Sequence, residues 1–229
     1  MEELVANGCS YMLGYGGDGI QDLARRLQIP ESSNIARAGS SNSRIIRTTL
    51  KHSYQTNKKT FYVIGLSFIC RWEISVSEPL DEFEGKWVNV ANSEFPPQYG
   101  WTKKDSESFT ELNFKGAMFG MQDILDDLIF RLLSMLSDLR SRGHQALIYS
   151  QIDKGTERFF NEFQLKLLRQ ETSFIDALQW CAVTWQRSQG VPAIETDTSS
   201  EDCKHLEAGY HDLLNKFLTD YIKQHNILK

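Results

Sequence analysis

The chain has 229 residues, of which 41% are hydrophobic and 24% charged, as is typical of a globular protein with an ordinary core. Its net charge of −5 argues against a broad surface that binds nucleic acid, and its apolar runs fall short of the ~18 residues that span a membrane. The N-terminus lacks the basic and then apolar segments of a signal peptide. These features favour a cytoplasmic protein, and a protein of a phage particle would share them.

The four cysteines, Cys9, Cys70, Cys181 and Cys203, do not form a metal-binding pattern. None pairs with another at C-x-x-C spacing, and only one histidine lies near any of them, so no zinc site is predicted. We expect free thiols in a reducing compartment.

The first predicted element is a short apolar strand that ends before a glycine. This strand, over 3–6 or 4–7, runs into Gly8-Cys9-Ser10-Tyr11. Ligands of open parallel sheets bind beyond the carboxyl ends of the strands, so we expect Ser10 at that edge. A serine hydroxyl becomes a nucleophile only beside a base, and that base must come from elsewhere in the chain.

Helical and apolar segments then alternate, which predicts an α/β fold with a parallel sheet between helices. A helix over 20–27 ends at Pro30, and a short strand over 34–38 runs into Gly39-Ser40-Ser41-Asn42. Ser41 or Asn42 can cap the next helix, which begins at Ser43. The continuous apolar run over 61–66 predicts a strand that is buried on both faces.

The pattern fails over about 70–116, where aromatic residues and turn residues are frequent. We predict an irregular insertion that folds over the edge of the sheet, because irregular stretches of this length inside a compact domain are usually functional or mobile. Its aromatic residues can stack on a substrate or pack the insertion against the body. They are Trp72, Trp87, Tyr99 and Trp101.

Regular structure resumes in the second half. A long amphipathic helix is predicted over 121–142 with Gly143 as its C-cap, followed by a strand over 146–149. One or two helices lie between 159 and 185, broken near Glu171, and a polar loop over 195–202 leads to a last amphipathic helix. Nothing in the sequence suggests a linker, so one domain is predicted over 1–229.

Of the five histidines, His205 is the candidate base. Asp202 precedes it by three residues, and in such a turn a carboxylate can hold the imidazole Nδ1–H and stabilise the imidazolium. Surface or capping roles are sufficient for the other four, which are His52, His144, His211 and His225.

Three motifs in this order resemble the blocks of the SGNH (GDSL-like) hydrolase superfamily. Gly8-Cys9-Ser10-Tyr11 is similar to its first block, 38–43 to its second, and 202–210 (DCKHLEAGY) to its last, Asp-x-x-His-Pro-x-x-x-Gly-aromatic. The resemblance implies a three-layer sandwich with a central parallel sheet, as in the flavodoxin-like fold of that family. The compact first block and the Ser-Ser-Asn turn resemble those of SGNH-like proteins found in bacteriophage genomes.

The third block of the family departs from the pattern. The family has Gly-x-Asn-Asp after the third strand, and its asparagine donates to the oxyanion, but this chain has no asparagine over 65–71. We expect an oxyanion hole built from the backbone N–H groups of Ser10 and of Gly39 or Asn42. The Asn42 side chain is the candidate for the third donor, and Ser67 is the lesser candidate.

The resemblance implies acyl transfer to water through a Ser-His-Asp triad, with no metal or organic cofactor. Ser10 attacks an ester carbonyl, His205 takes the proton and returns it to the leaving alkoxide, and Asp202 orients His205. The expected partner is a small-molecule or glycan ester. We predict an O-acetylated glycan, which Trp72, Trp101 and Arg71 would contact, while lipid esters and thioesters stay open.

Two other classes of protein remain. A non-catalytic binding or virion-associated protein with the hydrolase fold is favoured by the departed third block, because fold does not guarantee chemistry. The retained Ser10 and Asp-x-x-His favour the enzyme. A nucleotide-binding protein is poorly supported, because the glycine-rich run over 14–19 lacks the Gly-Lys-Ser/Thr ending of a phosphate loop.

Overall fold

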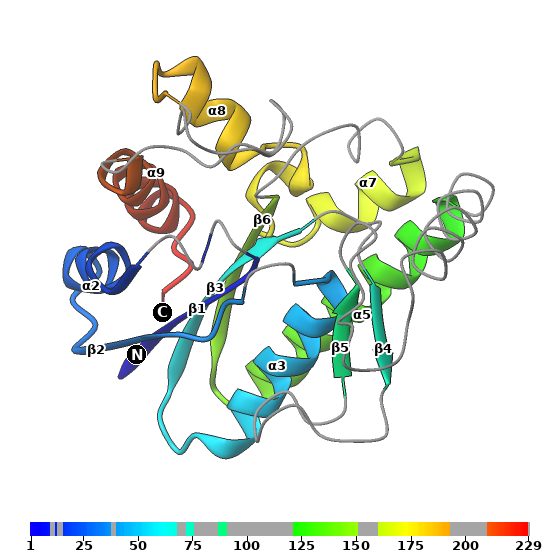
Figure 1. Ribbon diagram of the computed structural model, residues 1–229, viewed down its shortest axis with the longest axis horizontal. Coiled ribbons are helices and arrows are strands. Elements are labelled where there is room, and N and C mark those ends of the chain that lie inside the picture. The colour runs from blue at the N-terminus through cyan, green and yellow to red at the C-terminus, as the bar shows by residue number, and fades with distance from the viewer. Residues whose placement is uncertain are drawn as a thin grey trace, which may run out of the picture.

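A four-stranded parallel sheet in the order β2-β1-β3-β6 forms the centre of the molecule (Figure 1). The computed structural model describes residues 1–9, 12, 16–37, 40–67, 72–75, 87–90, 121–150, 160–192 and 210–228, with the backbone alone over 72–75 and 87–90. The strands are β1 (Glu3–Asn7), β2 (Glu31–Asn34), β3 (Thr60–Leu66) and β6 (Gln145–Ser150). β1 and β3 are buried throughout, as expected of parallel strands that are covered on both faces.

Helices cover both faces of this sheet, which gives the predicted three-layer sandwich (Figure 1). Leu4, Phe61 and Leu147 pack with α2 (Gly16–Arg26), α8 (Ala182–Ser188) and α9 (Tyr210–Gln224). Their neighbours in the strands, Val5, Tyr62 and Ile148, pack with α3 (Asn42–Gln55), α5 (Met121–Ser141) and α7 (Glu162–Arg169). Successive side chains of each strand therefore enter opposite layers.

The edge strand β2 lies earlier in the chain than the predicted strand over 34–38. Glu3 pairs with Glu31 and Ala6 with Asn34, so the strand is the polar sequence Glu-Ser-Ser-Asn. The apolar Ile35 and Ala36 suggested the later position. An edge strand is only half covered, and polar residues are therefore tolerated there.

The helix ends follow local chemistry. α2 ends at Arg26, before the predicted stop at Pro30, because Ile29 N–H donates to Ala24 O and Gln28 takes a left-handed φ of 58°. α5 ends at Ser141 and Gly143 has a φ of 80°, which confirms the predicted cap. The interruption near Glu171 is also confirmed, since α7 ends at Arg169 and α8 begins at Ala182.

Beyond β6 the chain makes two isolated parallel bridges, Ile148 with Phe174 and Ser150 with Cys181. A short 3-10 turn, η2 (Ile175–Leu178), lies between them and contains three successive residues with positive φ. Beside β6 the chain therefore forms two single bridges with a helical turn between them, in place of a further strand.

The predicted insertion contains regular structure. β4 (Trp72–Ser75) and β5 (Trp87–Val90) form an antiparallel pair, which the sequence analysis did not anticipate.

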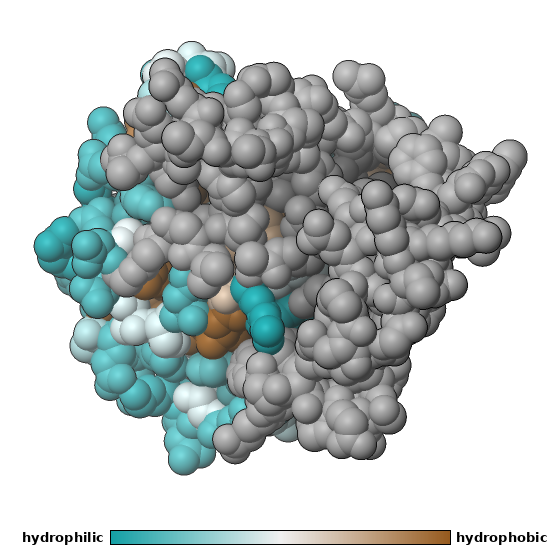
Figure 2. Space-filling view, in the orientation of Figure 1, coloured by the Kyte–Doolittle hydropathy of each residue, from teal (hydrophilic) through white to brown (hydrophobic). Residues whose placement is uncertain are grey.

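Figure 2 shows that the described surface around α2 is mostly hydrophilic, with apolar residues only in small areas. In the ranges that the structure describes, no helix has the length and apolarity needed to cross a membrane.

Candidate functional site at the carboxyl edge of the sheet

All four strands of the parallel sheet end at one edge, so the segments that follow them are neighbours. Asn7 ends β1, Asn34 ends β2 and Leu66 ends β3. Asn7 lies opposite Ile64 in the register. Ligands of open α/β sheets bind at this edge, and the predicted Gly-x-Ser turn, Asn42 and Ser67 all follow these strand ends.

In the turn after β1, the residues on both sides of positions 10 and 11 are tightly packed, while these two positions lie outside the described residues. Cys9 and Met12 are both fully buried, and Met12 N–H donates to Cys9 O at 3.0 Å. The Tyr149 hydroxyl lies 3.0 Å from the Met12 sulfur. Gly8 has no room for a side chain, because a β-carbon there would lie 2.4 Å from Met12 Cγ and 2.8 Å from Gly65 O.

Asn7 connects this turn to α3. Its side chain is fully buried, and its Nδ2 lies 3.0 Å from Ile45 O, 2.9 Å from Thr48 Oγ1 and 2.8 Å from Thr49 Oγ1. Its Oδ1 accepts from Gly8 N–H at 2.9 Å. The sequence analysis missed this residue, although a polar residue that ends an apolar strand was a usable signal.

The turn after β2 is held by buried polar groups. Ser41 is the N-cap of α3 and accepts from Arg44 N–H at 3.1 Å. The Arg44 side chain is only 2% exposed, and it donates to Ile35 O and Ser40 Oγ. The guanidinium therefore connects Ile35, at the start of this turn, to Ser40, near its end. The sequence analysis did not identify Arg44.

Asn42 bridges the turn after β2 to the end of β3. Its Nδ2 donates to Ser67 O at 3.0 Å, and its Oδ1 accepts from Ser67 N–H at 2.8 Å. An amide nitrogen carries two protons, so this bond uses one of them. The structure thus brings together two of the three predicted oxyanion-hole residues, Asn42 and Ser67.

α2 and α9, which follow Ser10 and His205 in the sequence, are hydrogen-bonded to each other. Ser10 shortly precedes α2, and Asp202 and His205 shortly precede α9. The fully buried Asn215 of α9 donates to Gly19 O and Asp22 Oδ2, both at 2.9 Å. Gly19 and Asp22 both lie in α2, so this buried amide joins the two helices directly.

Most of the predicted site residues lie outside the described residues. They are Ser10, Gly39, Arg71, Trp101, Asp202 and His205, and only the backbone of Trp72 is described. Their roles stay predictions. Within the ranges that are described, no group of three or more His, Cys, Asp or Glu residues is arranged to hold a metal ion, and Cys9 and Cys181 are both buried.

The opposite edge of the sheet contains a buried polar cluster. His144, predicted to be a surface or capping residue, is only 5% exposed, and its Nδ1 accepts from Thr60 N–H at 3.1 Å. His52 Nδ1 lies 2.9 Å from the Tyr62 hydroxyl. Burial lowers the pKa of both histidines and raises that of Tyr62, so the cluster is neutral near pH 7.

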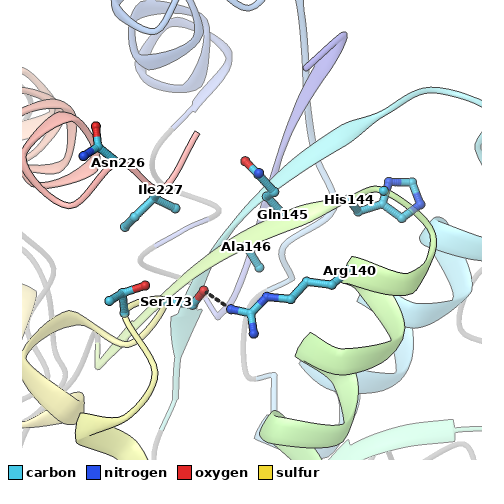
Figure 3. A pocket seen from close by; sticks show the side chains of 9 residues that line it. Arg140, His144, Gln145, Ala146, Ser173, Asn226 and Ile227 are labelled. Carbon is cyan, nitrogen blue, oxygen red and sulfur yellow. Dashed lines mark hydrogen bonds between the residues drawn. The ribbon is translucent and has the colours of Figure 1, made fainter. Parts of the chain in front are cut away.

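A pocket of about 300 Å³ opens at that same amino end of β6 (Figure 3). Figure 3 shows the Arg140 side chain reaching Ser173, with Gln145, Asn226 and Ile227 around the space. Arg140 also donates to both carboxylate oxygens of Glu171, at 2.7 and 2.5 Å. Its charge is therefore already neutralised, and the pocket lies on the wrong edge of the sheet for the predicted triad.

Solved structures share this fold over nearly the whole chain. TesA has 12% identity and a TM-score of 0.51, and the match covers 97% of this chain and 99% of TesA. A protein from Desulfitobacterium hafniense assigned to the G-D-S-L family of lipolytic proteins has 11% identity, coverage of 96% and 99%, and a TM-score of 0.53. The psychrotrophic esterase EstA from Pseudoalteromonas sp., in a structure inhibited by monoethylphosphonate, has 8% identity, coverage of 98% of both chains, and a TM-score of 0.52.

No protein-family model and no curated protein matches the sequence. The similarity to the solved structures lies in the fold, since the identities are 8–12%.

Proposed function

Because the chain has the fold of the SGNH (GDSL-like) hydrolases, we propose that it is a serine hydrolase that cleaves an ester by acyl transfer to water. Ser10 is the nucleophile, His205 the general base and Asp202 the group that orients His205. The leaving alkoxide takes the proton back from His205, and water then attacks the acyl-serine with the same residue as base.

The observation that carries this proposal is the junction of α2 and α9. The helix that follows Ser10 and the helix that follows His205 are bound to each other through Asn215, Gly19 and Asp22. α9 ends beside Gln145, at the amino end of β6. At about 1.5 Å per residue a helix of this length spans roughly 22 Å, and we infer that the segment before it brings His205 to the carboxyl edge.

The proposed oxyanion hole uses the backbone N–H groups of Ser10 and of Gly39 or Asn42. The Asn42 side chain, which is bound to Ser67, retains one N–H for the oxyanion. One such donor contributes about 3–4 kcal/mol to the lowering of the barrier. An enzyme that lacked it would be slow without being inactive.

The proposed substrate is an O-acetylated glycan. Its support is the sequence, which places Arg71, Trp72 and Trp101 in the segment after β3. Aromatic side chains bury large flat surfaces, and a sugar ring presents a matching apolar face. Short lipid esters and thioesters are the competing substrates in the test.

The test is labelling of the purified protein with a fluorophosphonate, followed by assays with acetylated glycans, short esters and thioesters. We expect labelling that is lost in Ser10→Ala and in His205→Ala. Ser53→Ala is the matched control, because Ser53 is a buried serine at the other end of α3, and it should label normally. Labelling that survives in Ser10→Ala would mean that another residue is the nucleophile.

A folded protein that is not labelled and cleaves none of these esters would contradict the proposal. It would favour a binding protein that retains the hydrolase fold, in line with the departed third block over 65–71.

A further inference from the structure

We infer that Asn7 is a positioning residue of the proposed active site, which sets the turn carrying Ser10 against the turn carrying the oxyanion donors. The inference rests on the proposed function, and it names a residue outside the triad and the oxyanion hole. Asn7 is the last residue of β1, and it is fully buried.

The first step concerns the hydrogen bonds that this side chain makes. Its Nδ2 faces three acceptors on α3, namely Ile45 O at 3.0 Å, Thr48 Oγ1 at 2.9 Å and Thr49 Oγ1 at 2.8 Å. The Thr48 hydroxyl donates its own proton to Arg44 O at 2.9 Å, so it faces Asn7 as an acceptor. The Asn7 amide is therefore the donor of this bond, and a donor at position 7 matches the three acceptors of α3.

The second step concerns the other end of the amide. Asn7 Oδ1 accepts from Gly8 N–H at 2.9 Å, and Gly8 is pressed against Met12 and the Gly65 carbonyl. One planar side chain thus binds the first residue of the Gly-x-Ser turn on one side and α3 on the other. A shift of α3 would be transmitted to Gly8.

The third step concerns what α3 carries. Its amino end is capped by Ser41, and its first residue, Asn42, is hydrogen-bonded to the Ser67 backbone at 2.8 and 3.0 Å. The turns after β1, β2 and β3 are therefore all attached to this one helix, with Asn7 as the attachment of the first. Reacting groups must be held within a fraction of an ångström, and a misplacement of about 1 Å can cost about a hundredfold in rate.

The experiment measures the second-order rate of fluorophosphonate labelling, together with kcat and KM on the best ester found. Asn7→Leu removes both ends of the connection. Thr48→Val with Thr49→Val removes two acceptors with little change in shape and leaves the Gly8 bond intact. We expect each to lower kcat and the labelling rate about tenfold to a hundredfold with little change in KM, and the combined variant to be no slower than Asn7→Leu.

The control is His144→Leu. It removes a buried polar side chain and its bond to Thr60 N–H at the opposite edge of the sheet, so it should lower the melting temperature without lowering kcat. All rates are expressed per folded molecule.

Normal labelling of the parent protein, with unchanged rates in the threonine pair, would overturn this inference alone. Multiplying defects in the combined variant would overturn it as well, because the threonines would then act independently of Asn7. If the folded parent protein is not labelled at all, the proposed function fails and this inference fails with it.

Discussion

Gly8 shows how a single residue shapes the candidate site. A β-carbon at this position would lie 2.8 Å from a backbone carbonyl oxygen, that of Gly65, in addition to the Met12 side chain. A flexible side chain can move away, but a strand carbonyl cannot move without breaking the sheet.

We therefore expect Gly8→Ala to lower the free energy of unfolding by about 1–3 kcal/mol, as overpacking of a core usually does. Denaturant unfolding measures this loss. In the background of Met12→Ala the substitution should still be destabilising, because the close contacts with Gly65 O and with the β-carbon of residue 12 remain. Full rescue by Met12→Ala would mean that the side-chain contact was the whole effect.

The burial of His144 predicts that the free energy of unfolding depends on pH. Its Nδ1 accepts a hydrogen bond from Thr60 N–H, which only a neutral ring can do, and burial lowers its pKa from 6.5. Burial also lowers the pKa of His52, while Glu3 opposes this shift and His144 adds to it. Among the residues that the structure describes, Glu3, Tyr62, Asp138 and Arg142 also face the pair.

In the unfolded chain a histidine takes up its proton below pH 6.5, while the folded protein resists protonation until the pH is lower. The free energy of unfolding should therefore be fully retained above that pH and fall as the pH is lowered from there toward the folded pKa, at no more than about 1.4 kcal/mol per pH unit for each proton. Urea titrations from about pH 8 to about pH 5 test this. His144→Asn should reduce the slope, and an identical slope in that variant would exclude His144 as a cause.

At the scale of elements, α3 depends on its cap. Ser41 caps α3, and Asn161 caps α7 in a reciprocal capping box with Gln164. Loss of either cap should lower the free energy of unfolding by about 1 kcal/mol.

The two capped helices differ in position, because α3 is hydrogen-bonded to the turns of the candidate site. Ser41→Ala and Asn161→Ala therefore form a matched pair. We expect Ser41→Ala alone to slow ester hydrolysis, because α3 holds the turns of the candidate site. Thermal unfolding and kcat measured side by side are the readouts. Equal slowing of hydrolysis in both variants would show that general stability, and not the position of the cap, controls the rate.

α2 and α9, which are far apart in the sequence, are in direct contact. Burial alone would raise the pKa of Asp22, but hydrogen bonds from Asn215, Arg25 and Arg26 lower it to about 2. Arg26 also forms an ion pair with Asp212 of α9, whose side chain is 78% exposed. The two helices are thus joined by one buried amide and one surface ion pair.

Asn215→Leu should lower the free energy of unfolding by about 1–3 kcal/mol, because Gly19 O loses its buried donor. Asp212→Asn should cost no more than about 1 kcal/mol, because exposed ion pairs contribute little. Chemical unfolding of both variants compares them. A larger loss in Asp212→Asn would mean that the surface ion pair dominates the junction.

The fold could be predicted where the spacing of the apolar residues and the residues at the ends of an element indicate the same structure. The strand over 61–66 and the long helix that ends before Gly143 were predicted because burial and local chemistry indicate the same structure. Ser41, the cap of α3, was one of the two residues predicted for that role. β2 was misplaced because pairing with β1, and not its own polar sequence, makes it a strand. β4 and β5, which pair with each other, were missed because they lie in a segment where turn residues are frequent.

The candidate site was predictable as a set of motifs and not as a set of contacts. The resemblance pointed to Ser10, Asp202 and His205 by sequence pattern alone. Asn7 and Arg44 were missed because long-range hydrogen bonds to α3 and to Ile35 O leave no local period in the sequence. His144 was misjudged for the same reason, since its partner Thr60 is distant in the chain.

The helical turn η2 has a consequence for how molecules of this protein meet one another. Asp176, Ala177 and Leu178 all have positive φ, and this backbone cannot continue a strand ladder. An uncovered strand at the border of a sheet can recruit a strand from another chain and start aggregation. Here one border is screened by this turn, and the other is the short polar strand β2, where Lys58 pairs with Glu31. Both borders of the sheet therefore discourage growth into a larger intermolecular sheet.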